Sequence, residues 1–292
     1  MDINEDFNFF NPKAGLFWQI DRRNSAYASF SVAQKEPSRN NYTDGSFAQY
    51  PKPEKMFDYE LGYTFRNQRF TAGVNLYYMD YTDQLVLNGQ LNEIGEPMAE
   101  NVKDSYRMGI ELTAGVKITD WLRWDVNATW SKNRIKNYVE YLSDYDESWN
   151  ELYTQTARQL GNTPIAFSPS FMAGSLFNFS HKGWEASLQS QYVSRQYLDN
   201  SGNKTNSIDA YFVSHLHAGY TFSCPYTKGI TVGATVYNIF NEKYETNGYS
   251  QSAAIYQTDA NGNKTGTAQI SNDPMYYPMA GTNVLFNIAV KF

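Results

Sequence analysis

The side chains in this sequence with the clearest metal-ligand chemistry are two histidines. His215 and His217 stand two positions apart, a spacing that directs both imidazoles to one face of a β-strand. Two imidazoles could begin a metal site, but no cysteine or acidic residue is spaced to complete a tetrahedral set, and His181 stands apart in a predicted turn. We therefore expect no bound metal.

Carboxylates and bases also recur at alternate positions along the chain, and such a set could suggest acid–base catalysis. No serine–histidine–aspartate pattern, phosphate-binding loop or dinucleotide fingerprint accompanies them. We expect no enzyme and no cofactor, and interpret these side chains as an ion network that faces water. They are Asp58, Glu60, Arg66, Arg69, Arg107, Glu111 and Lys117.

Aromatic residues in long polar stretches form the third candidate site. Their rings could stack on a small-molecule or chelate ligand. The alternative is that they pack one loop against another. The candidates are Tyr138, Tyr141, Tyr145, Trp149, Tyr153, Tyr249 and Tyr256.

The composition restricts the elements that can position these residues. Phe, Trp and Tyr make up 16% of the chain, with 24 tyrosines, while the mean hydropathy is only −0.59. A transmembrane β-barrel combines these properties, because alternate residues face water and aromatic girdles lie at the interfaces. No run of eighteen apolar residues predicts a membrane helix. A net charge of −6 argues against a nucleic-acid partner, and the single cysteine excludes a disulfide framework.

Period-two alternation predicts eleven amphipathic strands. The last one, residues 282–292, places Val284, Phe286, Ile288 and Val290 on one face and ends on Phe292. We expect the apolar faces, including Leu112 and Val126, to contact lipid, and residues such as Thr113 to face a wet lumen. The predicted strands cover about residues 9–20, 25–36, 55–66, 69–87, 105–118, 124–131, 167–179, 183–196, 210–223, 229–240 and 282–292.

Tight links and long polar loops alternate strictly between these strands. The loops are residues 40–53, 88–104, 137–166, 197–209 and 241–281. In transmembrane barrels the short turns are periplasmic and the long loops extracellular, so the C-terminus should be periplasmic. The fold class predicted is therefore an all-β, antiparallel transmembrane barrel wall in the outer membrane, in contact with its lipid.

An odd strand number does not fit a whole bacterial barrel, which normally closes with an even number. No basic and apolar leader follows Met1. We therefore expect residues 1–292 to be the C-terminal portion of a larger barrel. The isolated chain should form either a curved half-barrel with free edges or a forced closure of its first strand on its last.

Several stretches resemble TonB-dependent outer-membrane receptors, particularly those of Bacteroides-type bacteria, and the resemblance covers essentially the whole chain. Its most diagnostic part is the segment Tyr237–Tyr244 before a terminal strand that ends in Phe. The other stretches are residues 9–16, 35–39, 75–81 with 84–86, and 105–111.

The resemblance implies half of a 22-stranded barrel whose lumen holds a plug. The signal peptide, TonB box and plug domain of the family are not in this sequence. It further implies an importer for a scarce, bulky nutrient of the iron–siderophore, haem or cobalamin class, energised by the TonB complex. A SusC-type glycan or peptide importer, a plug-less structural or adhesive barrel, and a soluble all-β binding domain are the alternatives. We also expect the barrel-assembly machinery to recognise Phe292, because a terminal strand docks by its edge before a barrel closes.

Overall fold

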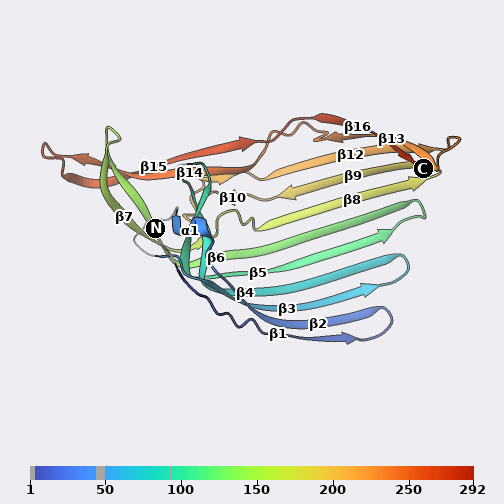
Figure 1. The fold of residues 1–292 in the computed structure, drawn as a ribbon, viewed down its shortest axis with the longest axis horizontal. Coiled ribbons are helices and arrows are strands. Elements are labelled where there is room, and N and C mark those ends of the chain that lie inside the picture. Colours follow the sequence, from blue (N-terminus) through green and yellow to red (C-terminus); the bar gives the residue numbers. More distant parts are fainter. Residues whose placement is uncertain (1–3, 44–49, 93) are drawn as a thin grey trace.

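The structure, a computed structural model, describes residues 4–43, 50–92 and 94–292. Its main feature is one antiparallel path of eleven strands in the order β1-β2-β3-β4-β5-β6-β8-β9-β12-β13-β16 (Figure 1). This confirms the predicted wall. The path consists of β1 (Lys13–Gln19), β2 (Asn24–Lys35), β3 (Glu54–Arg66), β4 (Phe70–Leu91), β5 (Pro97–Lys117), β6 (Leu122–Asp146), β8 (Phe171–His181), β9 (Trp184–Val193), β12 (Tyr211–Phe222), β13 (Gly229–Tyr237) and β16 (Asn283–Lys291).

The two ends of the wall differ in their connections. At one end the strands are joined by links of two to six residues, and the C-terminus lies there (Figure 1). At the other end the connections are long and carry the helix α1 (Arg39–Thr43) and the strands β7 (Glu151–Pro164), β10 (Gln196–Tyr197), β11 (Ser207–Ile208), β14 (Glu245–Thr258) and β15 (Lys264–Pro278). We call these the short-link end and the outer end.

The outer end is more ordered than the predicted long polar loops, since three of the five form extended paired ribbons. Strands β4, β5 and β6 are 22, 21 and 25 residues long, whereas about 9–11 residues cross a bilayer. They continue beyond the wall as paired ribbons, with β7 beside β6 and with β14 and β15 paired to each other. Period-two alternation did not predict these ribbons, because a ribbon surrounded by water needs backbone pairing but no continuous apolar face.

One face of the wall carries exposed apolar side chains. Leu76, Ile110 and Trp130 lie in register across β4, β5 and β6 and are 42%, 43% and 49% exposed. Leu112 and Val126 are on the same face, since Leu112 pairs with Val74 and Val126 with Ala114. This apolar band is what hydrocarbon contact requires.

The opposite face is polar and concave. The Tyr27 hydroxyl donates to Asn75 Oδ1 at 2.9 Å, and Asn75 Nδ2 donates to Glu111 Oε2 at 3.3 Å. Tyr27 lies flat across Gly62, its partner on β3, where a Cβ would come within 1.9 Å of the ring. Glycine at this position therefore allows an aromatic side chain to cover the inner surface of the sheet.

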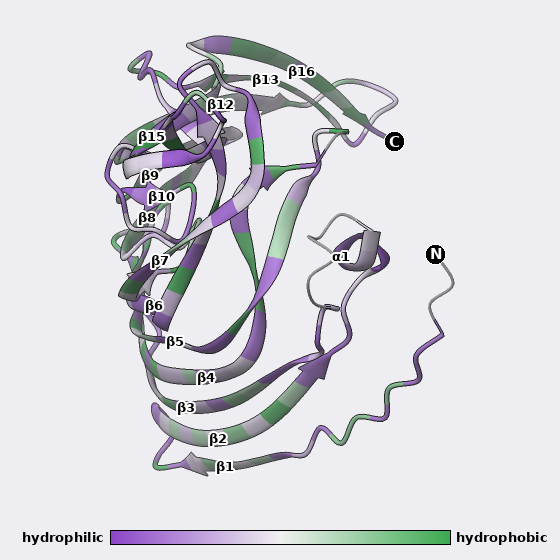
Figure 2. Cartoon of the chain, turned by 90° about the vertical axis from the view of Figure 1, so that its left-hand side faces the viewer, coloured by the Kyte–Doolittle hydropathy of each residue, from purple (hydrophilic) through white to green (hydrophobic). Residues whose placement is uncertain are grey.

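The sheet remains open. Among the described residues β1 pairs only with β2 and β16 only with β13, and Figure 2 shows the resulting arc. This confirms the half-barrel with free edges over forced closure. Within the same residues no helix is long and apolar enough to cross a bilayer.

Two outer ribbons end in turns of the same design. Asp146 Oδ1 accepts from the backbone N–H groups of Ser148 and Asn150, both at 2.8 Å, while Asn150 Nδ2 donates to Asp146 Oδ2 at 2.8 Å. Asp259 and Asn263 close the β14–β15 turn in the same way. The terminal Asp and Asn therefore fix each turn by themselves.

Candidate ligand-binding surfaces

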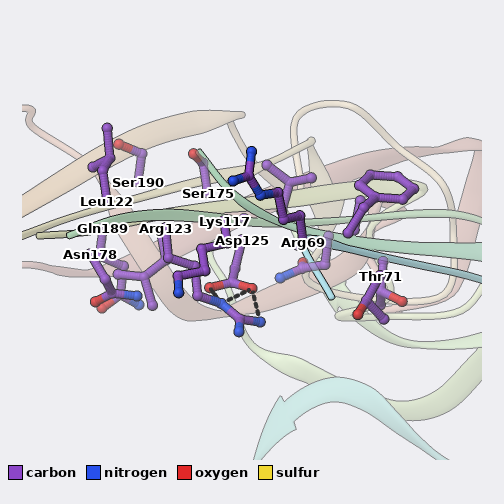
Figure 3. Close-up of a pocket in the computed structure, with 18 of the residues that line it drawn as sticks. Arg69, Thr71, Lys117, Leu122, Arg123, Asp125, Ser175, Asn178, Gln189 and Ser190 are labelled. Atoms are coloured by element: carbon purple, nitrogen blue, oxygen red, sulfur yellow. Dashed lines mark hydrogen bonds and ion pairs between the residues drawn. The ribbon is translucent and has the colours of Figure 1, made fainter. Parts of the chain in front are cut away.

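The inner face forms a polar hollow of about 1150 Å³ towards the short-link end (Figure 3). The Arg123 guanidinium and the Asp125 carboxylate form a bidentate pair, in which Nε donates to Oδ2 and Nη2 donates to Oδ1, each at 2.7 Å. Lys117 pairs with Asp120 in the adjacent link at 2.8 Å. Arg66 and Arg69 also line the hollow and have no ion-pair partner among the described residues. These two guanidinium groups make this surface suited to an anionic group.

The other charged residues singled out in the sequence are spread along the inner face. Tyr27 also approaches Glu60, at 3.3 Å, and Arg107 Nη1 donates to Ser168 Oγ at 2.8 Å. Asp58 Oδ1 is buried without a hydrogen-bond partner in the described part of the chain. The structure brings these groups together as a wall network, not as a convergent acid–base pair.

His215 and His217 do share the inner face of β12, and each is engaged by a neighbouring strand or its extension. His215 Nδ1 accepts from the Asn238 backbone N–H at 3.0 Å, and His217 Nδ1 lies 2.9 Å from Thr235 Oγ1. His217 Nε2 is 3.6 Å from Glu185 Oε1. Over the residues described, no group of three or more His, Cys, Asp or Glu side chains is arranged to hold a metal.

The outer end holds a packed cluster at the point where β4, β5 and β6 leave the wall. Val86, Val102, Ile135, Tyr138 and Ile165 form it, and all are less than one-tenth exposed. The outer strands are thus held together by a small core of their own.

Polar groups are buried beside this core. The Tyr138 hydroxyl donates to Glu100 Oε1 at 2.7 Å. Burial raises the pKa of Tyr138, and the nearby Glu100 carboxylate raises it further. Burial also raises the pKa of Glu100 and of Glu140, although Arg158 Nη1 donates to Glu140 at 2.8 Å and opposes the shift.

A second buried polar group joins the two longest ribbons. Asp144 of β6 is fully buried and accepts from Thr156 Oγ1 of β7 at 2.6 Å and from the Lys264 ammonium of β15. Burial disfavours the carboxylate of Asp144, but hydrogen bonds from Lys264 and the nearby threonines outweigh this and lower its pKa. Three parallel backbone pairs, Ala254 with Asp144 through Tyr256 with Asp146, complete the junction.

Of the seven aromatic candidates, four are buried or half-buried and three are exposed. Tyr138 is buried in the outer core, and Tyr256 is half-buried, with its hydroxyl 2.8 Å from Thr156 Oγ1. Tyr145 and Tyr249 are half-buried and contact Trp149 and Tyr277, with ring centroids 5.6 and 6.2 Å apart. Tyr141 and Trp149 are each 59% exposed, and Tyr153 is 87% exposed.

Sequence reasoning missed the Asp144–Lys264 junction. Its two residues are 120 positions apart, so no local pattern joins them. The signal available was indirect, namely the matching Asp-x-x-x-Asn turns that mark each ribbon.

Comparison with known proteins addresses the fold as a whole. The chain matches the family model described as TonB dependent receptor-like, beta-barrel, over residues 2–239. Comparison with curated protein sequences gives no significant match.

Three solved structures illustrate the likeness. The siderophore receptor PiuA from Acinetobacter baumannii has a TM-score of 0.67 and 15% identity, covering 96% of this chain and 35% of that chain. The ferric yersiniabactin uptake receptor FyuA from Yersinia pestis gives 0.63 and 16%, covering 96% and 37%. The FrpB iron transporter from Neisseria meningitidis gives 0.59 and 19%, covering 97% and 38%.

The chain therefore spans a little over a third of the length of these structures, and at such identities the likeness establishes the fold. The family match covers every strand of the wall except β16, and so it includes the strands that line the inner hollow. This chain belongs to the TonB-dependent receptor family, as part of its β-barrel domain.

Proposed function

We propose that this chain is the C-terminal portion of the barrel of an outer-membrane receptor that imports a scarce, bulky nutrient, with an iron chelate as the first candidate. The family match carries the proposal. The names of the similar structures, which include a siderophore receptor, a ferric uptake receptor and an iron transporter, support the choice of ligand.

The two ends of the wall suggest an orientation. Short turns face the periplasm in bacterial outer-membrane barrels, so the short-link end and the C-terminus would be periplasmic and the ribbons would project from the cell. The exposed rings of Tyr141, Trp149 and Tyr153 would then meet a ligand first, while Tyr138, Tyr145, Tyr249 and Tyr256 would support the ribbons that carry them.

The inner hollow fits the second part of the proposal. The receptor's plug would lie against it, and acidic side chains of the plug would pair with Arg66 and Arg69. The TonB complex would act on the plug from the periplasm. The role of this chain would then be to bind and guide the ligand, without covalent chemistry.

Assembly requires the last strand. Phe292 is 82% exposed beside β16, whose outer edge has no partner in the described part of the chain. Deleting Phe292 from the receptor should lower its outer-membrane level several-fold more than Lys291→Gln, as measured by immunoblotting of membrane fractions. Equal levels would contradict recognition of Phe292 by the assembly machinery.

Uptake by intact cells tests the proposed function. Cells that express the receptor from its complete reading frame would be given labelled ferric siderophores, haem and cobalamin, with and without a protonophore. We expect receptor-dependent accumulation of one of these chelates that the protonophore abolishes. Accumulation that persists with the protonophore would overturn energy-coupled import, and no receptor-dependent accumulation would overturn the chelate assignment.

A further inference from the structure

A second, smaller hollow lies at the outer end, between the β4–β5 ribbon and the base of the β14–β15 ribbon. Its volume is about 280 Å³, near the lower end of the ~300–1,000 Å³ typical of ligand pockets. It can hold one ring-sized group of a ligand, not a whole bulky molecule. The lining residues used below are Phe167, Tyr249, Tyr277, Gln90 and Asn247.

The two ribbons approach closely because each has a glycine against the same buried residue. A Cβ on Gly89 would lie 2.9 Å from the carbonyl oxygen of Leu198, and one on Gly248 would lie 3.1 Å from Leu198 Cδ2. Leu198 itself is fully buried. The hollow is therefore bounded by packed backbone, and its position is fixed by the fold.

Aromatic rings form its sides. Tyr249 and Tyr277 have ring centroids 6.2 Å apart at 46°, and Asn247 is paired directly opposite Tyr277, so all three share one face of the ribbon. Phe167 comes from the link between β7 and β8, where its backbone N–H donates to the carbonyl of Tyr197 at 2.9 Å. Its φ of 51° lies in the left-handed region, which is uncommon for a bulky residue and occurs at ligand-binding positions.

The polarity of the lining selects among ligands. None of the described residues that line this hollow is charged. Asn247 Nδ2 and the side-chain amide of Gln90 have no protein partner in the described part of the chain, so they can bind a ligand hydroxyl or carbonyl. An ionised group in this hollow would lose hydration without gaining a counter-ion.

We propose that this hollow is a subsite for an uncharged six-membered ring of the ligand, stacked on Tyr277 and Phe167 and hydrogen-bonded by Gln90 and Asn247. The ring can belong to a sugar or to an aryl group, since both present a flat apolar face. The inference rests on the proposed function to the extent that the outer end meets the ligand.

Binding of four probes tests the subsite. Outer-membrane vesicles with the receptor expressed from its complete reading frame would be examined by saturation-transfer difference NMR. The probes are methyl β-glucoside and benzamide, with glucuronate and benzoate as charged counterparts. We expect one uncharged probe to bind, about tenfold more tightly than its charged counterpart. Binding of the glucoside alone identifies a sugar and of benzamide alone an aryl group. No binding above receptor-free vesicles, or equal binding of charged and uncharged probes, would overturn the subsite.

Variants then locate the binding. Tyr277→Ala should weaken it about fivefold or more, because a stacked ring is lost, and Tyr277→Phe should retain it. Tyr226→Ala is the matched control, since Tyr226 is fully exposed in a short link at the other end of the wall. Surface labelling would confirm equal receptor levels. Equal effects of Tyr277→Ala and Tyr226→Ala would also overturn the subsite.

The two proposals can fail separately. Protonophore-sensitive uptake without ring binding would remove the subsite and leave the import function. Ring binding without protonophore-sensitive uptake would leave the subsite and remove the import function.

Discussion

The two halves of strand β6 pair with different strands and carry different patterns of side chains. From Leu122 to Trp130 it pairs with β8, and its outward side chains are all apolar, with Trp124 and Trp130 exposed. From Tyr138 to Tyr145 it pairs with β7, and its buried face mixes Leu142 with Glu140 and Asp144. Hydrocarbon supplies no hydrogen bonds, so a polar group on this face must find a partner within the wall, as Ser175 does by accepting from Trp124 Nε1 at 2.9 Å. The outer half meets other ribbons in water, where a buried carboxylate can find partners.

The open edges of the wall give the largest test of this difference. Each unpaired backbone group in hydrocarbon costs several kcal/mol, so the two free edges cost on the order of tens of kcal/mol, more than the usual 5–15 kcal/mol margin of a folded domain. The 292-residue chain reconstituted by itself should associate or aggregate, as seen by cross-linking in liposomes. A monomer that gave steady, ligand-gated uptake would contradict the lipid-exposed wall.

Removing a partner from the buried carboxylate is the next largest change. Lys264→Met leaves Asp144 fully buried without its cation and should destabilise the ribbon junction by about 3–5 kcal/mol. Faster proteolysis of the β14–β15 ribbon would report this. The double variant Asp144→Leu with Lys264→Met should recover much of the loss, and a double variant as labile as the single one would show that the charge pair is not the cause.

A charge on the lipid face tests the wall directly. Leu112→Arg or Val126→Arg should cost about 2–4 kcal/mol near the bilayer midplane, while Thr113→Arg on the inner face should cost much less. Folding titrations of the receptor in lipid vesicles would measure the difference. Equal losses would mean that the two faces are assigned incorrectly.

The smallest effect concerns Glu100 and pH. Its pKa is raised in the folded state above the unfolded value of about 4.3, so stability at the outer end falls as the pH rises from there through the folded pKa. Glu100→Gln should remove this fall and make the outer end more stable at neutral pH, because the neutral amide has no charge to bury. Hydrogen exchange around Tyr138 would measure it, and a variant that is less stable at neutral pH would reverse the sign.

The wall could be predicted from the sequence because apolar outward residues and polar inner residues alternate along most of its strands. Leu112 and Thr113 are adjacent yet lie on opposite faces of β5, and that contrast is visible in the residue types. The outer ribbons could not be predicted in this way, because both of their faces accept polar residues. Thr156 and Lys264 reach Asp144 only after two ribbons have packed together, and no periodicity encodes that contact.

The aromatic candidates show the same limit of prediction from sequence. Tyr138 and Tyr153 look alike in a polar stretch, but one is 8% exposed and the other 87%. The residues around a tyrosine in the sequence do not say whether a second ribbon will cover it. The hollow lined by Phe167 and Tyr277 was hidden for the same reason, since its sides come from separate segments.

The turns at Asp146–Asn150 and Asp259–Asn263 have a consequence for how this surface can change. The enclosed residues differ completely, Glu-Ser-Trp in one and Ala-Asn-Gly in the other, while the flanking clamp is the same. Because the clamp holds the ends of each turn, the first two enclosed positions can drift in sequence without unfolding the ribbon, whereas the third, Trp149 or Gly262, has a left-handed backbone that favours glycine. If the ribbons project from the cell as proposed, the first two enclosed positions of each turn are where a foreign epitope could be displayed while the frame of the turn is kept.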